Sequence, residues 1–274
     1  MGQHLAKTPG ALPPADSATV AGVSLPAGAR PLPSSDFAMH PKRAVRTSPL
    51  WLSAKPTDAI EKLVSPLIAA FPSTGLWPLV LETLEGAPER PWLAGEIDPS
   101  GASDPAHHDV STILGAWWSN VVPSEDEDPE ALAALAPFGR TFPGLAKPSK
   151  SGPVGPIAAA LAEREGSLGL TSVTRPADAV AAIGWLGPIN CFSDMGMLAA
   201  VLRSWEDRFD AYVIGIGFDT LTLAVGRPVD EARARAVAAE HFAVCPDAIY
   251  QGEGSIEAHA ETLVDAISWS FWWD

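Results

Sequence analysis

The stretch EHFAVCPDAIYQ, residues 240–251, gathers polar side chains that could do chemistry at the end of a predicted helix. His241 and Cys245 lie four positions apart, so on a helix both side chains could share one face. A thiol beside an imidazole forms the thiolate–imidazolium pair on which cysteine hydrolases and transferases depend. Glu240 or Asp247 would then orient the imidazole, and a helix start just after Cys245 would favour the thiolate. These four residues are the candidate catalytic group.

The same residues could instead brace the fold. In that interpretation Cys245 fills core space at the helix end, Asp247 caps the next turn, and His241 and Gln251 hydrogen-bond loop carbonyls. Glu240 has alanines and valines three and four positions away, so its carboxylate must find a donor or have its pKa raised. Structural networks use the same residue types as active sites, and the sequence leaves both interpretations open.

Two further groups of residues could hold a metal ion. The loop SDPAHHDVS, residues 103–111, offers two histidines, but adjacent histidines in a strand or loop point apart and no third ligand is placed by the spacing. Cys191, Cys245 and His241 would form a soft-ligand set only if the fold joined them. GIGFDT, residues 215–220, precedes a strand rather than a helix, which excludes a phosphate loop. We predict no metal site and no cofactor.

Ten tryptophans against two tyrosines are unusual. Tryptophan buries a large apolar area and its N–H requires an acceptor, so the core and the walls of pockets are its usual positions. In the predicted last strand, the adjacent Trp272 and Trp273 point to opposite faces, and an exposed tryptophan there would favour a binding surface. The candidate binding residues are Gln251, Trp272, Trp185 and Asn190.

The charge of the chain limits the class of partner. The formal net charge is −15, although residues 1–50 alone carry five basic and two acidic side chains. Nucleic acids and anionic membranes both require a local density of lysine and arginine, so neither is an expected partner. A basic or apolar protein partner is easier to accommodate on the acidic body. The sequence does not determine the oligomeric state.

Features of the sequence that report on location are few. The longest apolar runs, such as AYVIGIGF (211–218), are much shorter than the roughly 18 residues that cross a bilayer. The first residues carry one lysine and a broken apolar pattern, unlike a signal peptide. Two cysteines 54 positions apart make no disulfide framework. A cytoplasmic location is therefore expected.

The first half of the chain predicts two regions. Residues 1–46 are rich in Pro, Ala, Gly and Ser and predict a flexible, disordered tail, with one short strand allowed over VSLPAGARPL (23–32). Residues 47–153 predict a loop-rich α/β part, in which a helix begins after Thr57 as N-cap and is kinked or broken at Pro66. A buried strand over LWPLVLETL follows this helix.

Residues 154–274 predict a more regular α/β domain. SDMGMLAAVLRSWEDRF has its apolar residues at helical spacing, AYVIGIGF is apolar on both faces, and LTLAVGR alternates like the partner strand of a hairpin. Two helices follow, the second with Ser255 as N-cap, and then the closing strand ISWSFWWD, with Ile267, Trp269, Phe271 and Trp273 on one face. We predict an α/β fold, with α+β as the alternative, in which helices pack on a mixed β-sheet.

LRSWEDRFDAYVIGIGFDTLTLAVGRP and AAEHFAVCPDAIYQGEGSIEAHAETLVDAISWSFWWD resemble the bacterial family of domain of unknown function 4253. GLWPLVLETL, RPWLAGE, PFGRTFPGLA and GWLGPIN resemble its longer actinobacterial members. The similarity covers roughly residues 168–274 and rests on E-H-x-x-x-C-P-D, a following Gln and a terminal FWWD. The resemblance implies a bacterial, cytoplasmic protein and brings no activity, substrate or catalytic residue. Ala248 and Tyr250 depart from the polar residues expected after CPD.

Two functions therefore compete. The acidic body, the surplus of tryptophan and the lack of a complete catalytic signature favour a non-catalytic protein-binding or regulatory module, such as an immunity-type protein that sequesters a protein partner. The alternative is a Cys/His-based hydrolase or transferase centred on the EHFAVCPD segment. The contact, or lack of contact, between His241 and Cys245 is the observation that separates them.

Overall fold

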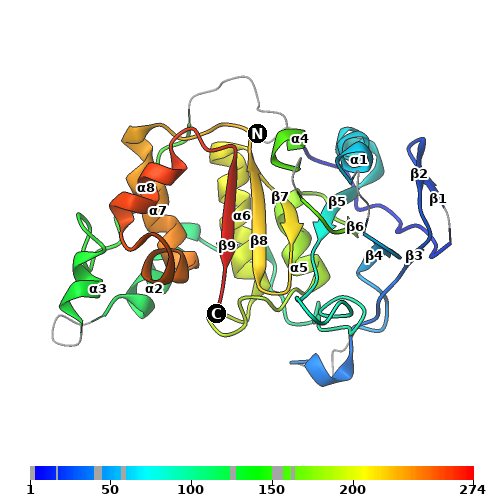
Figure 1. Ribbon diagram of the computed structural model, residues 1–274, viewed down its shortest axis with the longest axis horizontal. Helices are drawn as coiled ribbons and strands as arrows, with labels where there is room; N and C mark the ends of the chain where they lie inside the picture. Colours follow the sequence, from blue (N-terminus) through cyan, green and yellow to red (C-terminus); the bar gives the residue numbers. More distant parts are fainter. Residues whose placement is uncertain are drawn as a thin grey trace.

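A computed structural model describes residues 4–16, 18–39, 45–56, 60–123, 128–149, 157–161 and 164–274. Its centre is a seven-stranded mixed sheet with the order β3-β4-β6-β5-β7-β8-β9 (Figure 1). These strands are β3 (Gly28–Ala29), β4 (Leu50–Ser53), β5 (Leu76–Leu81), β6 (Ser167–Ser172), β7 (Ala211–Ile216), β8 (Thr220–Val225) and β9 (Ser268–Trp272). β5 and β7 are parallel and the other neighbouring pairs are antiparallel. The predicted mixed sheet with packed helices is confirmed.

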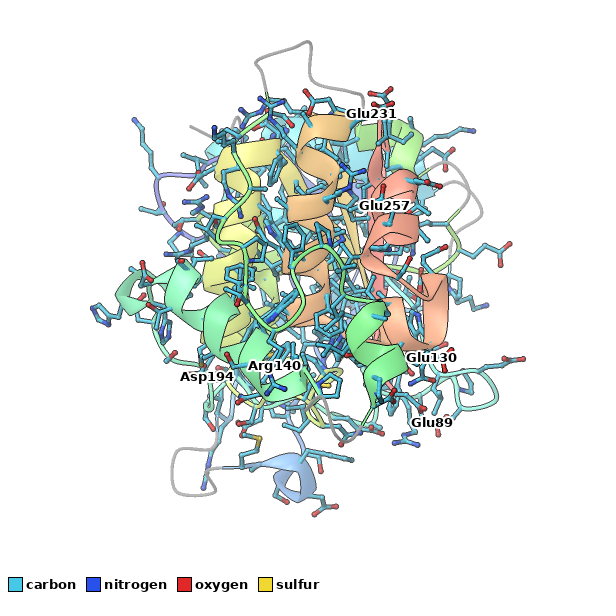
Figure 2. All side chains as sticks on the ribbon, turned by 90° about the vertical axis from the view of Figure 1, so that its left-hand side faces the viewer. Glu89, Glu130, Arg140, Asp194, Glu231 and Glu257 are labelled. Carbon is cyan, nitrogen blue, oxygen red and sulfur yellow. The ribbon has the colours of Figure 1, made fainter. Side chains whose placement is uncertain are left out.

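Helices lie against both faces of this sheet. α1 contacts β5 and α4, and α4 contacts β8, whereas α5 contacts β6 and α6 contacts β7. α2 and the α7–α8 pair extend the α6 layer, and Figure 2 looks onto this side of the molecule. The helices are α1 (Ile60–Thr74), α2 (Val110–Val121), α3 (Pro129–Ala133), α4 (Ile157–Leu161), α5 (Ala179–Ile183), α6 (Met195–Phe209), α7 (Glu231–Val244) and α8 (Ile256–Leu263). Shorter turns are η1 (Ser35–Phe37), η3 (Pro105–His107), η4 (Pro176–Asp178) and the π-helical η5 (Ala248–Glu253).

The two parallel strands are buried along their whole length because helices cover them on both sides. Pro78 is tolerated in β5 because the ladder to β7 begins only at Val80. The side chain of the preceding residue, Trp77, donates its Nε1–H to the Val213 carbonyl of β7 at 2.6 Å. Strands from the two predicted parts, residues 47–153 and 154–274, therefore share one sheet.

The structure differs from the expectation of a flexible tail over residues 4–16 and 18–39. Β-strands β1 (Ala18–Val20) and β2 (Val23–Leu25) form a hairpin, and β3 pairs with β4. Gly10 donates its backbone N–H to the Gly75 carbonyl at 3.0 Å, a close approach that leaves no room for a side chain. The Pro/Gly composition reflects extended chain that follows the surface of the body, with Leu25 as one of its anchors in the core.

The C-terminal elements follow the sequence pattern closely. Ser255 caps α8 by accepting the Ala258 N–H, as predicted. In β9 the residues alternate between exposed and buried, with Trp269, Phe271 and Trp273 inward, but Ile267 is 47% exposed and does not join that face.

One of the helix predictions falls outside the described residues, and another is corrected by the structure. Thr57 lies outside the described residues. α1 continues through Pro66, because Val64, Leu67 and Phe71 bury one continuous face of the helix. Among the residues described, none of the helices combines the length and the apolar composition required to cross a bilayer.

Candidate functional site

The carboxylate of Glu240 is completely buried between α7 and α6 and is saturated with donors. Its Oε1 accepts from the Ala146 backbone N–H at 2.7 Å and from Arg208 Nη1 at 2.7 Å. Its Oε2 accepts from Trp205 Nε1 at 2.7 Å and from Arg208 Nη2 at 2.6 Å. Because both oxygens are engaged, the group joins α7, α6 and the segment before α4, and neither oxygen is open to a substrate.

His241 contacts a second histidine instead of the thiol. Its Nδ1 lies 3.1 Å from Nε2 of His259, and the ring packs against Trp205, Trp269 and Phe271. Burial, together with the positive groups nearby, holds the pKa of His241 well below 6.5, and burial lowers that of His259 to about 4. Both imidazoles are therefore neutral near pH 7, and one must donate to the other.

The Cys245 thiol is turned toward the sheet. Its Sγ–H donates to the Trp272 carbonyl at 2.9 Å, and its backbone N–H donates to the His241 carbonyl at 2.7 Å. Burial raises the pKa of this thiol to about 12, so it is protonated at neutral pH. The expected thiol–imidazole pair is absent between Cys245 and His241, because their side chains engage β9 and α8 separately. This corrects the catalytic arrangement predicted from the i, i+4 spacing.

The remaining two members of the segment lie at the surface of η5. Gln251 Nε2 donates to Asp247 Oδ1 at 2.9 Å, so it holds a carboxylate rather than the predicted loop carbonyl. Asp247 Oδ2 accepts the Asp274 N–H at 3.3 Å and thereby links η5 to the end of β9. These contacts tie elements together and leave no shared opening with His241.

The other groups considered for metal binding have structural contacts. Asp104 caps η3 by accepting the Ala106 N–H, Asp109 caps α2 by accepting the Thr112 N–H, and His108 lies 2.5 Å from the Ser103 hydroxyl. Cys191 is exposed whereas Cys245 is buried. No three His, Cys, Asp or Glu side chains in the described ranges are grouped closely enough to hold a metal ion.

A pocket of about 450 Å³ opens at a different place, where β5, β7 and β9 all reach their carboxyl ends. This edge of an α/β sheet commonly binds ligands because loops there surround a crevice. In Figure 1 it is the lower edge, near the C-terminus. The lining comes from five segments: Phe37 and Met39; Arg90, Pro91 and Glu96; Trp185, Leu186, Gly187, Ile189 and Asn190; Phe218 and Asp219; and Trp273 and Asp274.

Polar contacts fix the walls of this pocket. Arg90 forms an ion pair with Glu96, and its guanidinium carbon lies 4.8 Å from the centre of the Phe218 ring. Trp185 donates its Nε1–H to the Gly217 carbonyl at 2.9 Å. The arginine is therefore already neutralised by its partner, and the tryptophan is held against the turn between β7 and β8.

The carboxylates of the pocket differ from those of the buried cluster. Asp219 and Asp274 line it, and neither side chain makes an ion pair within the described part of the chain. Asp274 is exposed and Asp219 is partly exposed. Apolar walls beside two unpaired carboxylates suit a ligand with an apolar body and a positive group.

Two of the four predicted binding residues meet in this pocket. Trp185 and Asn190 line it, and the Asn190 side chain approaches the Asp274 carbonyl at 3.5 Å. Trp272 is 37% exposed on the outer face of β9, and its neighbour Trp273 is the one that lines the pocket. Gln251 does not line it.

Other lining residues were not predicted. Arg90 and Glu96 fall in RPWLAGE, and Phe218 and Asp219 fall in the GFDT turn, two segments that the sequence singled out for other reasons. A turn directly after a doubly buried strand was a usable signal, since parallel strands end at the ligand-binding edge. No sequence signal pointed to Phe37, because it lies in the segment predicted to be a tail.

Residues 167–274 match the family described as domain of unknown function DUF4253. Residues 167–274 are therefore called the DUF4253 region. No curated protein and no solved structure matches the chain. The DUF4253 region supplies Trp185, Asn190, Phe218 and Trp273, whereas Phe37, Met39, Arg90 and Glu96 come from outside it. The pocket is therefore built jointly by the family region and the preceding chain.

Proposed function

We propose that the protein is a non-catalytic protein-binding module that holds an apolar, positively charged segment of a partner protein in the pocket at the carboxyl edge of the sheet. The observation that carries the proposal is the apolar rim around that pocket. Phe37, Met39 and Ile189 are between 36% and 39% exposed at its mouth. Such a concentration of exposed large side chains is typical of an interaction surface.

The rim continues beyond the pocket. Leu32 and Leu93 are each 59% exposed, and their segments are joined by the Ser34 N–H, which donates to the Gly95 carbonyl at 2.9 Å. In Figure 1 the blue turn at the lower edge, η1, belongs to this region. An apolar surface wider than the pocket favours a protein over an isolated small molecule as partner.

The charge of the pocket favours a basic segment. Asp219 and Asp274 are unpaired among the described residues, and Arg90 is neutralised by Glu96. A lysine or arginine next to an apolar side chain would satisfy both features. A cytoplasmic location is part of the proposal, and two cysteines without a disulfide support it.

The test compares two short peptides, acetyl-Leu-Leu-Arg-amide and acetyl-Leu-Leu-Glu-amide, by titration followed with ¹⁵N chemical shifts. The arginine peptide is expected to bind at least about 5-fold more tightly and to shift the amides of Gly187 and Asp219. Asp219→Asn should reduce that preference about threefold, because one carboxylate is lost. Asp16→Asn, which removes an exposed carboxylate outside the pocket, is the matched control and should leave it unchanged. Equal affinity for the two peptides, or shifts confined to other regions, would contradict the proposal.

The reactivity of the two thiols tests the competing hydrolase or transferase hypothesis. Iodoacetamide is expected to modify Cys245 at least about 100-fold more slowly than an ordinary exposed thiol at pH 8, because a pKa near 12 leaves little thiolate. Cys191→Ser isolates Cys245, and Cys245→Ser isolates the exposed Cys191. Rapid modification of Cys245 in the folded Cys191→Ser variant would revive thiol catalysis.

A further inference from the structure

The outer edge of β9 presents unpaired backbone groups. The Val225 N–H donates to the Ile267 carbonyl at 2.8 Å, and the Trp273 N–H donates to the Asp219 carbonyl at 3.1 Å. Since β8 and β9 pair antiparallel without a register shift, residues 267, 269, 271 and 273 direct their backbone groups toward β8. Ser268, Ser270 and Trp272 therefore direct theirs away from the sheet.

Most of this edge is open. The Trp272 carbonyl accepts a hydrogen bond from the Cys245 thiol. Ser268 and Ser270 are exposed, and their outward backbone groups have no hydrogen-bond partner within the described part of the chain. Native edge strands are normally protected by lysine, proline, a bulge or a covering element, and β9 has none of the first three. The opposite edge of the sheet, β3, is only two residues long.

The side chains of β9 leave space for a neighbouring strand. Ser268 and Ser270 are small and face outward together with Trp272, which is 37% exposed, while Trp269 and Phe271 hold the strand to the core from the other side. An added strand would meet two small side chains and one large aromatic contact, the pattern that gives specificity in strand addition.

The charges around this edge select the kind of strand. Asp265 and Asp274 flank β9, and Glu165 lines a groove beside Ser268. All three carboxylates are exposed, and none makes an ion pair within the described ranges. Figure 2 shows a further carboxylate, Glu231, at the outer surface of α7, whereas Glu257 on α8 is paired with Arg235. A second copy of a chain with net charge −15 would add like charge, whereas a basic strand would neutralise it.

We propose that β9 accepts an extended, positively charged segment of a partner protein, which joins the sheet as an eighth strand through the N–H and C=O groups of Ser268 and Ser270. This surface shares with the proposed function the premise of a protein partner, and it shares with the pocket Asp274, which lies where β9 reaches the pocket. Main-chain hydrogen bonds would supply the affinity, and lysine or arginine at the ends of the added strand would face Asp265 and Asp274.

The experiment uses acetyl-Lys-Val-Thr-Val-Thr-Val-Lys-amide as probe, with the version carrying glutamate in place of lysine as charge control. Binding is measured by ¹⁵N chemical shifts and by the hydrogen-exchange protection of the Ser268 and Ser270 amides. The lysine peptide is expected to protect both amides and to bind at least about 5-fold more tightly than the glutamate peptide. Two further versions, N-methylated either on the valines or on the threonines, block one edge of the probe each. One of them should bind at least about tenfold more weakly and the other should not.

A variant of the protein tests the same edge. Ser270→Pro removes only an outward N–H and leaves the ladder to β8 intact, so it is expected to fold and to weaken the lysine peptide about tenfold. Ser270→Ala keeps the N–H and should stay within about twofold. The N-methylated peptides decide the question if Ser270→Pro unfolds.

Three results would overturn the proposal. The first is that the lysine peptide, at up to about 1 mM, does not protect the Ser268 and Ser270 amides. The second is that the two N-methylated versions bind equally. The third is that the free protein sediments as a dimer in which these two amides are already protected. Asp219→Asn should leave strand binding unchanged, so failure at the edge and failure at the pocket are distinguishable.

Discussion

The buried cluster around Glu240 and the pocket at the carboxyl edge of the sheet use similar residue types in opposite ways. In the cluster every carboxylate oxygen is matched to a donor, and the thiol and both imidazoles are uncharged. In the pocket two carboxylates have no ion-pair partner among the residues that the structure describes, and apolar side chains reach the surface. Residues able to do chemistry therefore hold the helices to the sheet, whereas the recognition proposed for the pocket uses a different set of side chains.

The comparison also separates stability from function. A group whose partners are all internal contributes to the folded state and offers nothing to a ligand. A group left without a partner at an accessible edge contributes little to folding and is available for binding. Substitutions in the two regions should therefore have opposite consequences.

The largest effect is expected for Glu240→Gln, which leaves the Arg208 guanidinium without a compensating charge in a buried place. The free energy of unfolding should fall by about 3–5 kcal/mol, as for other broken buried ion pairs. Urea denaturation followed by tryptophan fluorescence measures it.

The pocket variant Asp219→Asn is the control for that substitution and should change the free energy of unfolding by less than about 0.5 kcal/mol, because the side chain is partly exposed and makes no ion pair within the described ranges. Comparable losses in the two variants would remove the distinction between the cluster and the pocket.

Acid should weaken the cluster next. The pKa values of His241 and His259 are lowered by burial, so the unfolded chain takes up protons near pH 6.5 that the folded chain does not. The stabilisation is complete above about pH 6.5 and is lost as the pH falls toward 4, by about 3 kcal/mol for His259 alone. Urea unfolding at intervals from pH 8 to about pH 4.5 would record this loss.

Glu206 acts in the opposite direction and must be separated from the histidines. Burial, partly opposed by Arg175, raises its pKa to about 7, so its contribution is present at low pH and is lost as the pH rises from 4.5 toward 7. His259→Gln keeps an amide that can bond to His241 and removes one titrating group. Its stability should depend less steeply on pH between 4.5 and 6.5 than that of the parent protein. Parallel curves would assign the acid sensitivity to other groups.

Local sequence pattern was sufficient for the elements of the C-terminal half. The helical spacing of Leu198, Val201 and Trp205 and the alternation in ISWSFWWD each follow from one periodicity, and the structure contains α6 and β9 at those places. The burial of Glu240 was also accessible, because its apolar neighbours along α7 required a buried carboxylate to find a donor.

The partners of those residues could not be read from the chain. Glu240 meets Ala146 across 94 positions, and His241 turns to His259 because α8 folds back on α7. An i, i+4 spacing shows that two side chains are able to meet, but packing on the sheet decides which way each one turns. The pocket escaped prediction for the same reason, since its five segments meet only through the strand order.

The strand order has one more consequence. β5 lies between β6 and β7, although β6 and β7 belong to the DUF4253 region and β5 precedes it by many residues. A fragment of residues 167–274 would lack β5, the strand between β6 and β7, and the edges of β6 and β7 that pair with β5 would be exposed to solvent. The region that must fold together therefore extends beyond residues 167–274, because β5 from the preceding chain lies between β6 and β7 in the sheet.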